Sequence, residues 1–249
     1  MSRVTAFESL RLATVYPPQL VCFLSTLCDE RQIALTEAIR ECLTAARTLG
    51  GAPLMTHERL AYLAHRKKLH LHTVVADVLE RGAAQLPEAP QSLRTGIHEF
   101  SPEEVEAVIK KLGLSDSQIR SSGLRFAPQI PLQELAHLER VVETEQMGIH
   151  EAAKSRLEFW RTLGGASIKA HQRIRRFAST KGISLEGAVA NVLTENARQL
   201  EDPPPDLVLP HGLQVLPLDG LLERLGERLV EAKAKAVKAS AKARKKVGR

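Results

Sequence analysis

The hexapeptide Arg-Thr-Leu-Gly-Gly-Ala occurs twice in the chain, at residues 47–52 and again at residues 161–166. At the same offset of 114, residues 17–86 align with residues 131–200 without a gap and share 25 identities in 70 positions. Most mismatches keep the apolar character of the position, as where Leu60 faces Ile174. The sequence therefore predicts a tandem duplication, with two copies of one fold.

Each copy contains a helix pair whose apolar pattern recurs 36 residues later, so the pattern is present four times. In the first helix of the chain, Leu20, Leu24 and Leu27 have the three-and-four spacing of one buried stripe. The second helix is expected to end at Gly50-Gly51, because glycine takes the left-handed conformation that ends helices. Hydrophobic residues make up 43% of the chain and aromatic residues only 4%, which predicts a close-packed aliphatic core.

Two short strands are predicted, one ahead of each copy. In Leu10–Tyr16 the residues Arg11, Ala13 and Val15 share one face, opposite an apolar face. In Gly123–Pro131 the corresponding face holds Arg125, Ala127 and Gln129. Pro128 is compatible with a two-stranded ribbon, which has only edge strands. No strand fits between the Gly-Gly turns and the helices that follow them.

These patterns predict a mainly α fold with a short two-stranded antiparallel β-ribbon and tandem duplicated helical modules. The linker is expected to hold one short helix, which begins with the capping box Ser101–Glu104. The expected segments are a first repeat at 10–86, a linker at 87–122, a second repeat at 123–200, a C-terminal extension with one helix at 201–231, and a basic Lys/Ala tail at 232–249.

The positive net charge of +6 belongs to the tail. Residues 232–249 hold eight Lys or Arg and no acid, which leaves 27 basic residues against 29 acidic ones in 1–231. Attraction to a polyanion is therefore expected mainly from the tail and from local patches of the body.

A strand that ends at proline, followed by two helices with a tight turn between them, resembles the ribbon-helix-helix DNA-binding superfamily of Arc, MetJ and CopG. The best match to the turn is Lys181–Glu186, with Ser184 as N-cap. The resemblance covers Leu10–Leu49 and Gly123–Leu163, whereas the other two modules match over the helices only. It implies that the strands pair into a ribbon for the DNA major groove, and that the N-terminus of each second helix holds a backbone phosphate.

By position, the resemblance makes Arg11, Ala13, Val15, Arg125, Ala127 and Gln129 the groove-facing residues. Arginine can bind a guanine edge, glutamine can pair with adenine, and alanine or valine can contact a thymine methyl group. Two further sets of cations are candidate phosphate contacts, one in the fourth module and one in the tail: Arg173, Arg175 and Arg176, and Lys233, Lys235, Lys238, Lys242, Arg244, Lys245 and Lys246.

Other classes of function find little support in the sequence. The chain has no phosphate-binding glycine loop, no metal-ligand spacing and no nucleophile elbow, so neither an enzyme nor a cofactor or metal site is expected. Cys22, Cys28 and Cys42 occur in the first copy only and are expected to be buried thiols. No apolar run is long enough for a membrane span and no signal peptide is visible, so a cytoplasmic protein is expected.

The expected function is binding of double-stranded DNA, as a transcriptional repressor or as a plasmid maintenance or conjugation accessory factor. The alternatives are a protein-interaction scaffold, such as an antitoxin-like adaptor with a protein partner, and a nucleoid-type protein that binds DNA without sequence preference. The two strands could pair within one chain, as a pseudo-dimer, or between two chains, and further homo-oligomers stay open.

Overall fold

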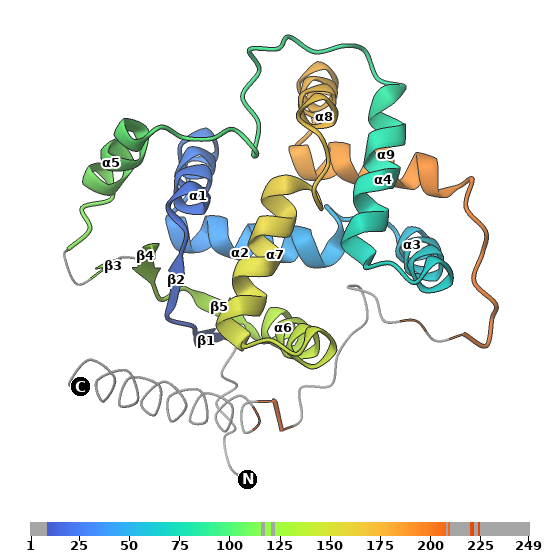
Figure 1. The fold of residues 1–249 in the computed structure, drawn as a ribbon, viewed down its shortest axis with the longest axis horizontal. Coiled ribbons are helices and arrows are strands. Elements are labelled where there is room, and N and C mark those ends of the chain that lie inside the picture. The colour runs from blue at the N-terminus through green and yellow to red at the C-terminus, as the bar shows by residue number, and fades with distance from the viewer. Residues whose placement is uncertain are drawn as a thin grey trace, which may run out of the picture.

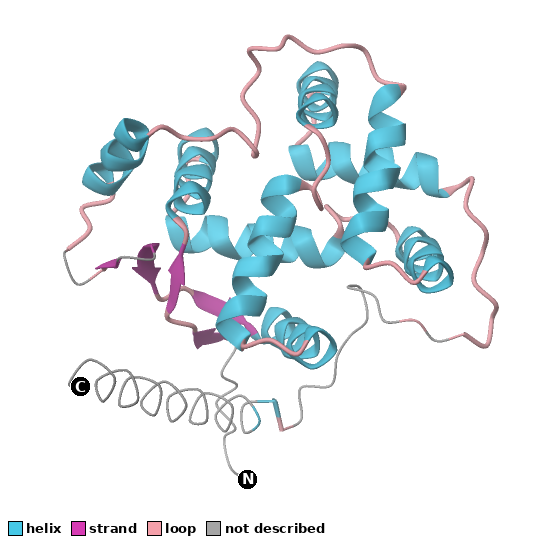
Figure 2. Cartoon of the chain, in the orientation of Figure 1, coloured by secondary structure: helices cyan, strands magenta, loops and turns pink. Residues whose placement is uncertain are grey.

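The computed structural model describes residues 9–115, 118–120, 123–207, 209, 220, 221 and 224. In these residues the protein is mainly helical with a short antiparallel ribbon, which confirms the predicted fold class (Figures 1 and 2). The helices are α1 Pro18–Arg31, α2 Leu35–Thr48, α3 Leu54–Lys67, α4 Leu71–Ala84, α5 Pro102–Lys111, α6 Leu132–Glu145, α7 Ile149–Thr162, α8 Ile168–Lys181 and α9 Leu185–Ala197. Apart from α5 in the linker, they form four helical hairpins that repeat at the offsets of 36 and 114 found in the sequence.

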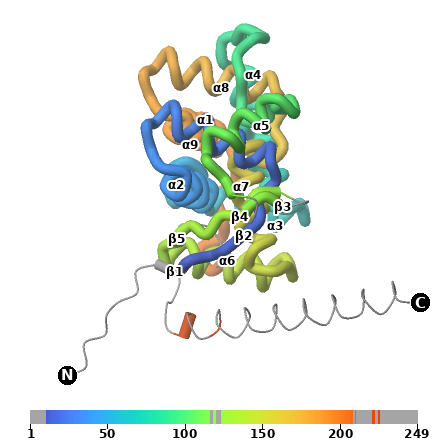
Figure 3. Tube along the Cα trace, turned by 90° about the vertical axis from the view of Figure 1, so that its left-hand side faces the viewer, coloured from blue at the N-terminus to red at the C-terminus, as the bar shows by residue number. Residues whose placement is uncertain are grey.

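The ribbon is formed within one chain. Strand β1 (Ser9–Arg11) pairs antiparallel with β5 (Gln129–Pro131), and β2 (Thr14–Tyr16) pairs with β4 (Gly123–Phe126). The two pairings share one register, and between them the Leu12 N–H donates to the carbonyl of Pro128 at 3.0 Å. A two-residue strand, β3 (Ile119–Arg120), also pairs with β4 and was not predicted from the sequence. Figures 2 and 3 show the strands gathered together, on the opposite side of the molecule from α4 and α8.

The helix ends refine the sequence prediction. The C-cap of α2 is Leu49, with a φ of 51°, and Gly50 and Gly51 follow it, also at positive φ. Leu163 caps α7 in the same way. The predicted capping box of the linker helix is present, because the Glu104 N–H donates to Ser101 Oγ and the Ser101 N–H donates to Glu104. Ser184 is the N-cap of α9, as expected.

The ribbon layer consists of the ribbon with α1, α2, α6 and α7. Helices α2 and α7 pack against each other at its centre, and their buried side chains are mostly small or aliphatic, such as Ala38, Ile39 and Ala152. Trp160 is 3% exposed and fills the core where the first copy has Ala46. The aliphatic core predicted from the composition is therefore present, with one large aromatic side chain in the second copy.

The distal layer consists of α3, α4, α8 and α9, and lies away from the ribbon in Figure 1. Its two hairpins pack mainly against each other, with α4 against α9, and no described residue between α2 and α3 or between α7 and α8 forms a strand. The two layers meet where Gly50 contacts the backbone of Glu186, and where Gly164 contacts the backbone of His72. Since Glu186 and His72 are also 114 residues apart, the two contacts are related by the duplication.

The linker packs against the ribbon layer. Gln19 on α1 exchanges two hydrogen bonds of 2.8 Å with the backbone of Phe100, and Arg161 on α7 donates to the carbonyl of Gly96 at 2.8 Å. The helix predicted within the C-terminal extension, at residues 218–230, lies largely outside the described residues. Of that segment, Leu221 is buried and Arg224 donates to both carboxylate oxygens of Glu139, at 2.9 and 3.0 Å.

Candidate nucleic-acid interface

The outer face of the ribbon consists of the six residues predicted to face outward, namely Arg11, Ala13, Val15, Arg125, Ala127 and Gln129. Five of them are exposed and Val15 is half-buried. The register places Arg11 opposite Gln129 and Val15 opposite Arg125, with Ala13 and Ala127 facing each other between them. The ribbon thus presents all six side chains on one surface, in three cross-strand pairs.

The inner face of the ribbon is anchored in the core. Leu12, Tyr16, Leu124 and Ile130 are at most 2% exposed. Burial raises the pKa of Tyr16 to about 12, so its phenol stays neutral at physiological pH. The buried hydroxyl of Thr14 lies 3.0 Å from His150 Nδ1 on α7. Because the inner face of the ribbon is buried in the core, the direction of the outer side chains is fixed without a ligand.

Arg11 and Arg125 differ from the other arginines of the described part of the chain. Every other arginine side chain that the structure describes forms an ion pair, a hydrogen bond or another electrostatic interaction within the protein. Arg11 and Arg125 form no hydrogen bond or ion pair through their guanidinium groups with any described residue, although Val15 and Gln129 lie opposite them. With respect to the described part of the chain, these two equivalent side chains therefore keep all their donors for a ligand.

The N-termini of α2 and α7 lie beside the ribbon. Neither N-cap, Ala34 or Gly148, provides a side-chain hydrogen bond, so backbone N–H groups of both first turns remain available. Each first turn also carries an acid paired three residues later with a base, Glu37 with Arg40 at 3.3 Å and Glu151 with Lys154 at 3.0 Å. The duplicated pairs could have been found in the sequence from their common offset, but they were not singled out.

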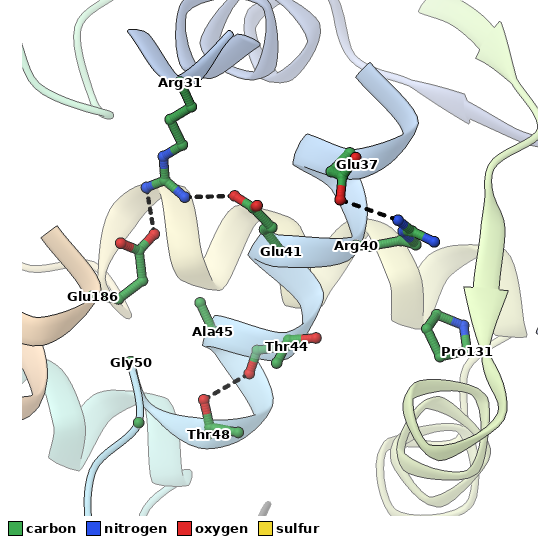
Figure 4. A pocket seen from close by; sticks show the side chains of 11 residues that line it. Arg31, Glu37, Arg40, Glu41, Thr44, Ala45, Thr48, Gly50, Pro131 and Glu186 are labelled. Atoms are coloured by element: carbon green, nitrogen blue, oxygen red, sulfur yellow. Dashed lines mark hydrogen bonds and ion pairs between the residues drawn. The ribbon is translucent and has the colours of Figure 1, made fainter. Parts of the chain in front are cut away.

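Figure 4 shows the surroundings of the first of these turns. Arg40 and Pro131 of β5 line the same surface pocket, of about 530 Å³, which extends along α2 to Gly50. At the other end of the pocket Arg31 bridges Glu41, at 2.7 Å, and Glu186, at 2.5 Å. Of the two cations that line this pocket, Arg40 lies at the side of the ribbon, whereas Arg31 joins the two helical layers.

The three arginines of α8 that were predicted to clamp phosphates have partners inside the protein. Arg173 donates to the carbonyls of Ala83 and Ala84 and to the carboxylate of Glu88, at 3.1 to 3.3 Å. Arg175 pairs with Glu30 on α1, and Arg176 donates to the carbonyl of Glu88. Arg173 and Arg176 thus lie at the joint between α8, the end of α4 and the linker, whereas Arg175 joins α8 to α1. The tail cations Lys233, Lys235, Lys238, Lys242, Arg244, Lys245 and Lys246 lie outside the described residues.

The repeated histidines have a structural partner. Nε2 of His57 lies 2.9 Å from the carbonyl of Thr48, and Nε2 of His171 lies 2.9 Å from the carbonyl of Thr162. Because a carbonyl only accepts, Nε2 carries the proton in both. Each histidine thereby adds a side-chain donor to a carbonyl at the C-terminus of α2 or α7 that already accepts from two backbone N–H groups. Among the described residues, no three His, Cys, Asp or Glu side chains are arranged to hold a metal ion.

The cysteines are free thiols in an apolar setting. Cys22 and Cys42 are buried and Cys28 is half-buried. Burial raises the pKa of all three thiols, to about 11 for Cys22, so the reactive thiolate is disfavoured at neutral pH.

Sequence reasoning missed a buried ion pair that supports the ribbon layer. Glu134 on α6 is 3% exposed and accepts from Nε of Arg47 at 2.9 and 3.0 Å and from Thr44 Oγ1 at 2.9 Å. Its equivalent in the first copy is Leu20, a fully buried apolar residue. The sequence contained a signal for this pair, because Glu134 is a charged residue at a position of the buried apolar stripe.

No protein-family model, curated protein or solved structure matches the chain. Among the described helices, none combines the length and the hydrophobicity needed to cross a membrane.

Proposed function

We propose that this chain is an internally duplicated protein of the ribbon-helix-helix type that binds double-stranded DNA in the cytoplasm. One polypeptide supplies both strands of the ribbon, and the outer face of the ribbon enters the major groove. Occupancy of an operator or of a plasmid maintenance site by such a ribbon would provide repression or accessory activity.

The observation that carries the proposal is that Arg11 and Arg125 are exposed and that their guanidinium groups bind no other described residue. A solvated strand face would explain one exposed arginine. Here the two exposed arginines occupy equivalent positions of the duplication, point to the same side of the ribbon, and make no hydrogen bond or ion pair with any described residue. Such a pair of unengaged guanidinium groups suits a ligand with hydrogen-bond acceptors at two places.

The dimensions of the face suit the major groove. Four residues separate the level of Arg11 from that of Val15 and Arg125, which corresponds to about 13 Å along the strand. Laid along the groove, this length spans about four base-pair steps of about 3.4 Å, and the major groove is wide enough to admit a two-stranded ribbon. Arginine binds guanine O6 and N7 through two hydrogen bonds, glutamine binds adenine, and small apolar side chains contact the thymine methyl group.

Phosphate contacts would hold the ribbon in register. The uncapped first turns of α2 and α7, with Arg40 and Lys154 beside them, are the described groups suited to the flanking backbone. We assign no phosphate to Arg173, Arg175 or Arg176, because they bind groups of α1, of α4 and of the linker, away from the ribbon. The basic tail would add a salt-sensitive contribution that does not depend on sequence.

The test is the double variant Arg11→Ala/Arg125→Ala, measured against a duplex selected by the unmodified protein and against a random duplex. Each bidentate contact is worth about 1–3 kcal/mol, so affinity for the selected duplex should fall at least about 30-fold, with much less change for random DNA. The matched control is Arg66→Ala/Arg198→Ala, which removes two exposed arginines far from the ribbon in sequence. Unchanged discrimination in the ribbon double variant would remove the ribbon from DNA reading.

The alternative functions give other outcomes in the same assay. Residues 1–231 contain more acids than bases, which favours a protein-interaction scaffold if that body shifts no duplex at moderate salt. A nucleoid-type protein would shift every duplex with the same affinity.

A further inference from the structure

The duplication leaves the outer face of the ribbon only partly symmetric. The offset of 114 takes Arg11 to Arg125 and Ala13 to Ala127, but it takes Val15 to Gln129. Two of the three outward positions are thus identical in the two strands, and the third combines an apolar β-branched side chain with an amide.

The register turns this difference into two unlike ends. At one end Arg11 faces Gln129, at the other end Arg125 faces Val15, and the small Ala13 and Ala127 separate them. Directly opposite side chains on one face have Cβ atoms about 5 Å apart, so each pair acts on the same base or on neighbouring bases. One end offers two hydrogen-bonding side chains, whereas the other offers one and a methyl-bearing surface.

The two strands also differ in the contacts that their inner residues make with the helices beneath the ribbon. The hydroxyl of Thr14 is held 3.0 Å from His150 Nδ1, whereas the equivalent of Thr14 is Pro128, which has no hydroxyl, and the equivalent of His150 is Thr36. The two strands therefore differ both in what they present and in how α7 and α2 hold them.

We propose that the chain recognises an imperfect inverted repeat, in one fixed orientation, as a single polypeptide. This inference rests on the proposed function. A guanine is expected at each end of a core of about four base pairs, since the two arginine levels are about 13 Å apart. The base beside the guanine is expected to be adenine at the Gln129 end and thymine at the Val15 end.

The preference for one orientation follows from the cross-strand pairs. Rotating the DNA by half a turn keeps both guanines in place for Arg11 and Arg125 but exchanges the bases that meet Gln129 and Val15. The loss of one bidentate glutamine–adenine contact is worth about 1–3 kcal/mol, which corresponds to a preference of about 5- to 150-fold.

Reciprocal substitutions at the two unlike positions test the inference. Val15→Gln gives both ends an Arg-Gln pair, and Gln129→Val gives both ends an Arg-Val pair. Oligonucleotides are selected from a random library by the unmodified full-length protein and by each variant, with circular dichroism and thermal unfolding used to confirm the fold. The unmodified protein should select an asymmetric site, and each variant should select a perfect inverted repeat of its own, the first with adenine and the second with thymine beside the guanines.

A perfect inverted repeat selected by the unmodified protein, or an identical site selected by all three proteins, would overturn the inference while leaving DNA recognition in place. Two chains on the short selected site, counted by native mass spectrometry, would overturn it as well. Enrichment of no sequence by the unmodified protein would be a failure of the proposed function itself, which separates the two.

Discussion

At the scale of single residues, the repeated glycines show why the hexapeptide was retained in both copies. Gly50 and Gly164 have φ angles of +74° and +76°, and a Cβ at either position would overlap a backbone carbonyl, of Glu186 or of His72. Gly51 and Gly165 have similarly positive φ but no atom within 4 Å of such a Cβ. The first glycine of each pair is thus required for close approach of the layers, and the second only for the backbone conformation.

This difference gives a prediction with an internal control. Gly51→Ala should cost about 1–2 kcal/mol of unfolding free energy, from the left-handed conformation alone. Gly50→Ala should cost clearly more, because the layers must also separate to admit the methyl group. Denaturant unfolding of the two variants measures the difference, and equal losses would mean that the contact with Glu186 does not hold the layers together.

Glu134 gives a second prediction at this scale. Glu134→Leu, which installs the residue found at the equivalent position of the first copy, removes the carboxylate that faces Arg47. Breaking a largely buried pair from one side costs about 3 kcal/mol, whereas Glu37→Gln, in the exposed pair with Arg40, should cost less than about 1 kcal/mol. Urea titrations of the two variants provide the comparison. A loss below about 1 kcal/mol for Glu134→Leu would mean that the buried pair contributes no more than a surface one.

At the scale of elements, the sequence predicted the helices and the ribbon well because their determinants are local. Alternation placed Arg11, Ala13 and Val15 outward, and the spacing of apolar residues gave all four hairpins. Pairing partners in space were harder to predict. The packing of α4 against α9, and the use of Arg173 to bind the end of α4, depend on contacts between residues about 90 to 115 positions apart, which periodicity does not encode.

The candidate site could be predicted in position but not in detail. The identity of the six outward residues followed from the pattern, and their exposure bears out the alternation. The register, which pairs Arg11 with Gln129 rather than with Arg125, needed the structure, because a slip of either strand by two or four residues would have kept its apolar face inward.

A prediction at the element scale separates binding from folding. Ala13 and Ala127 are exposed at the centre of the outer face. Ala13→Glu/Ala127→Glu should place two carboxylates against the groove and reduce affinity for every duplex by at least about 10-fold, whereas repulsion between the two opposite carboxylates should cost no more than about 1 kcal/mol of stability in thermal unfolding. Ala13→Ser/Ala127→Ser is the matched polar control. Mobility-shift titrations at fixed salt measure the effect, and duplex binding unchanged by the carboxylates would place the DNA elsewhere on the protein.

At the scale of the whole molecule, buried and half-buried histidines make stability depend on pH. Burial, with Arg156 and other cations nearby, lowers the pKa of His137 to about 3, and burial also lowers the pKa of His72, His150 and His171. A lowered pKa means that the unfolded chain binds more protons than the folded one below about pH 6.5. The free energy of unfolding is therefore highest above about pH 6.5 and decreases as the pH falls toward 3.

His137→Phe tests this, because phenylalanine occupies the equivalent position of the first copy at Phe23. The variant should lose less stability than the unmodified protein between pH 6.5 and pH 4, as followed by chemical unfolding across that range. The control is His65→Phe, at an exposed residue. Parallel stability curves for His137→Phe and the unmodified protein would show that His137 is not the residue responsible.

Deletion of residues 232–249 tests how much the positive charge of the tail contributes to DNA affinity. The deletion removes eight cations, and each phosphate that they neutralise contributes about 0.9 to the slope of log affinity against log salt. Affinity for all duplexes should fall, the slope should become shallower, and the order of preference among duplexes should stay the same. A changed order of preference would assign base reading to the tail.

The pairing of β1 and β2 with β5 and β4 inside one polypeptide has a consequence for a protein present in few copies. A DNA-binding face assembled from two separate subunits is lost when the protein is diluted. At low concentration the amount of such a dimer rises with the square of the subunit concentration. Here the linker keeps the two half-faces together at an effective concentration that dilution leaves untouched. If the chain binds DNA as proposed, each newly synthesised polypeptide therefore carries a complete binding face, whatever the number of copies in the cell.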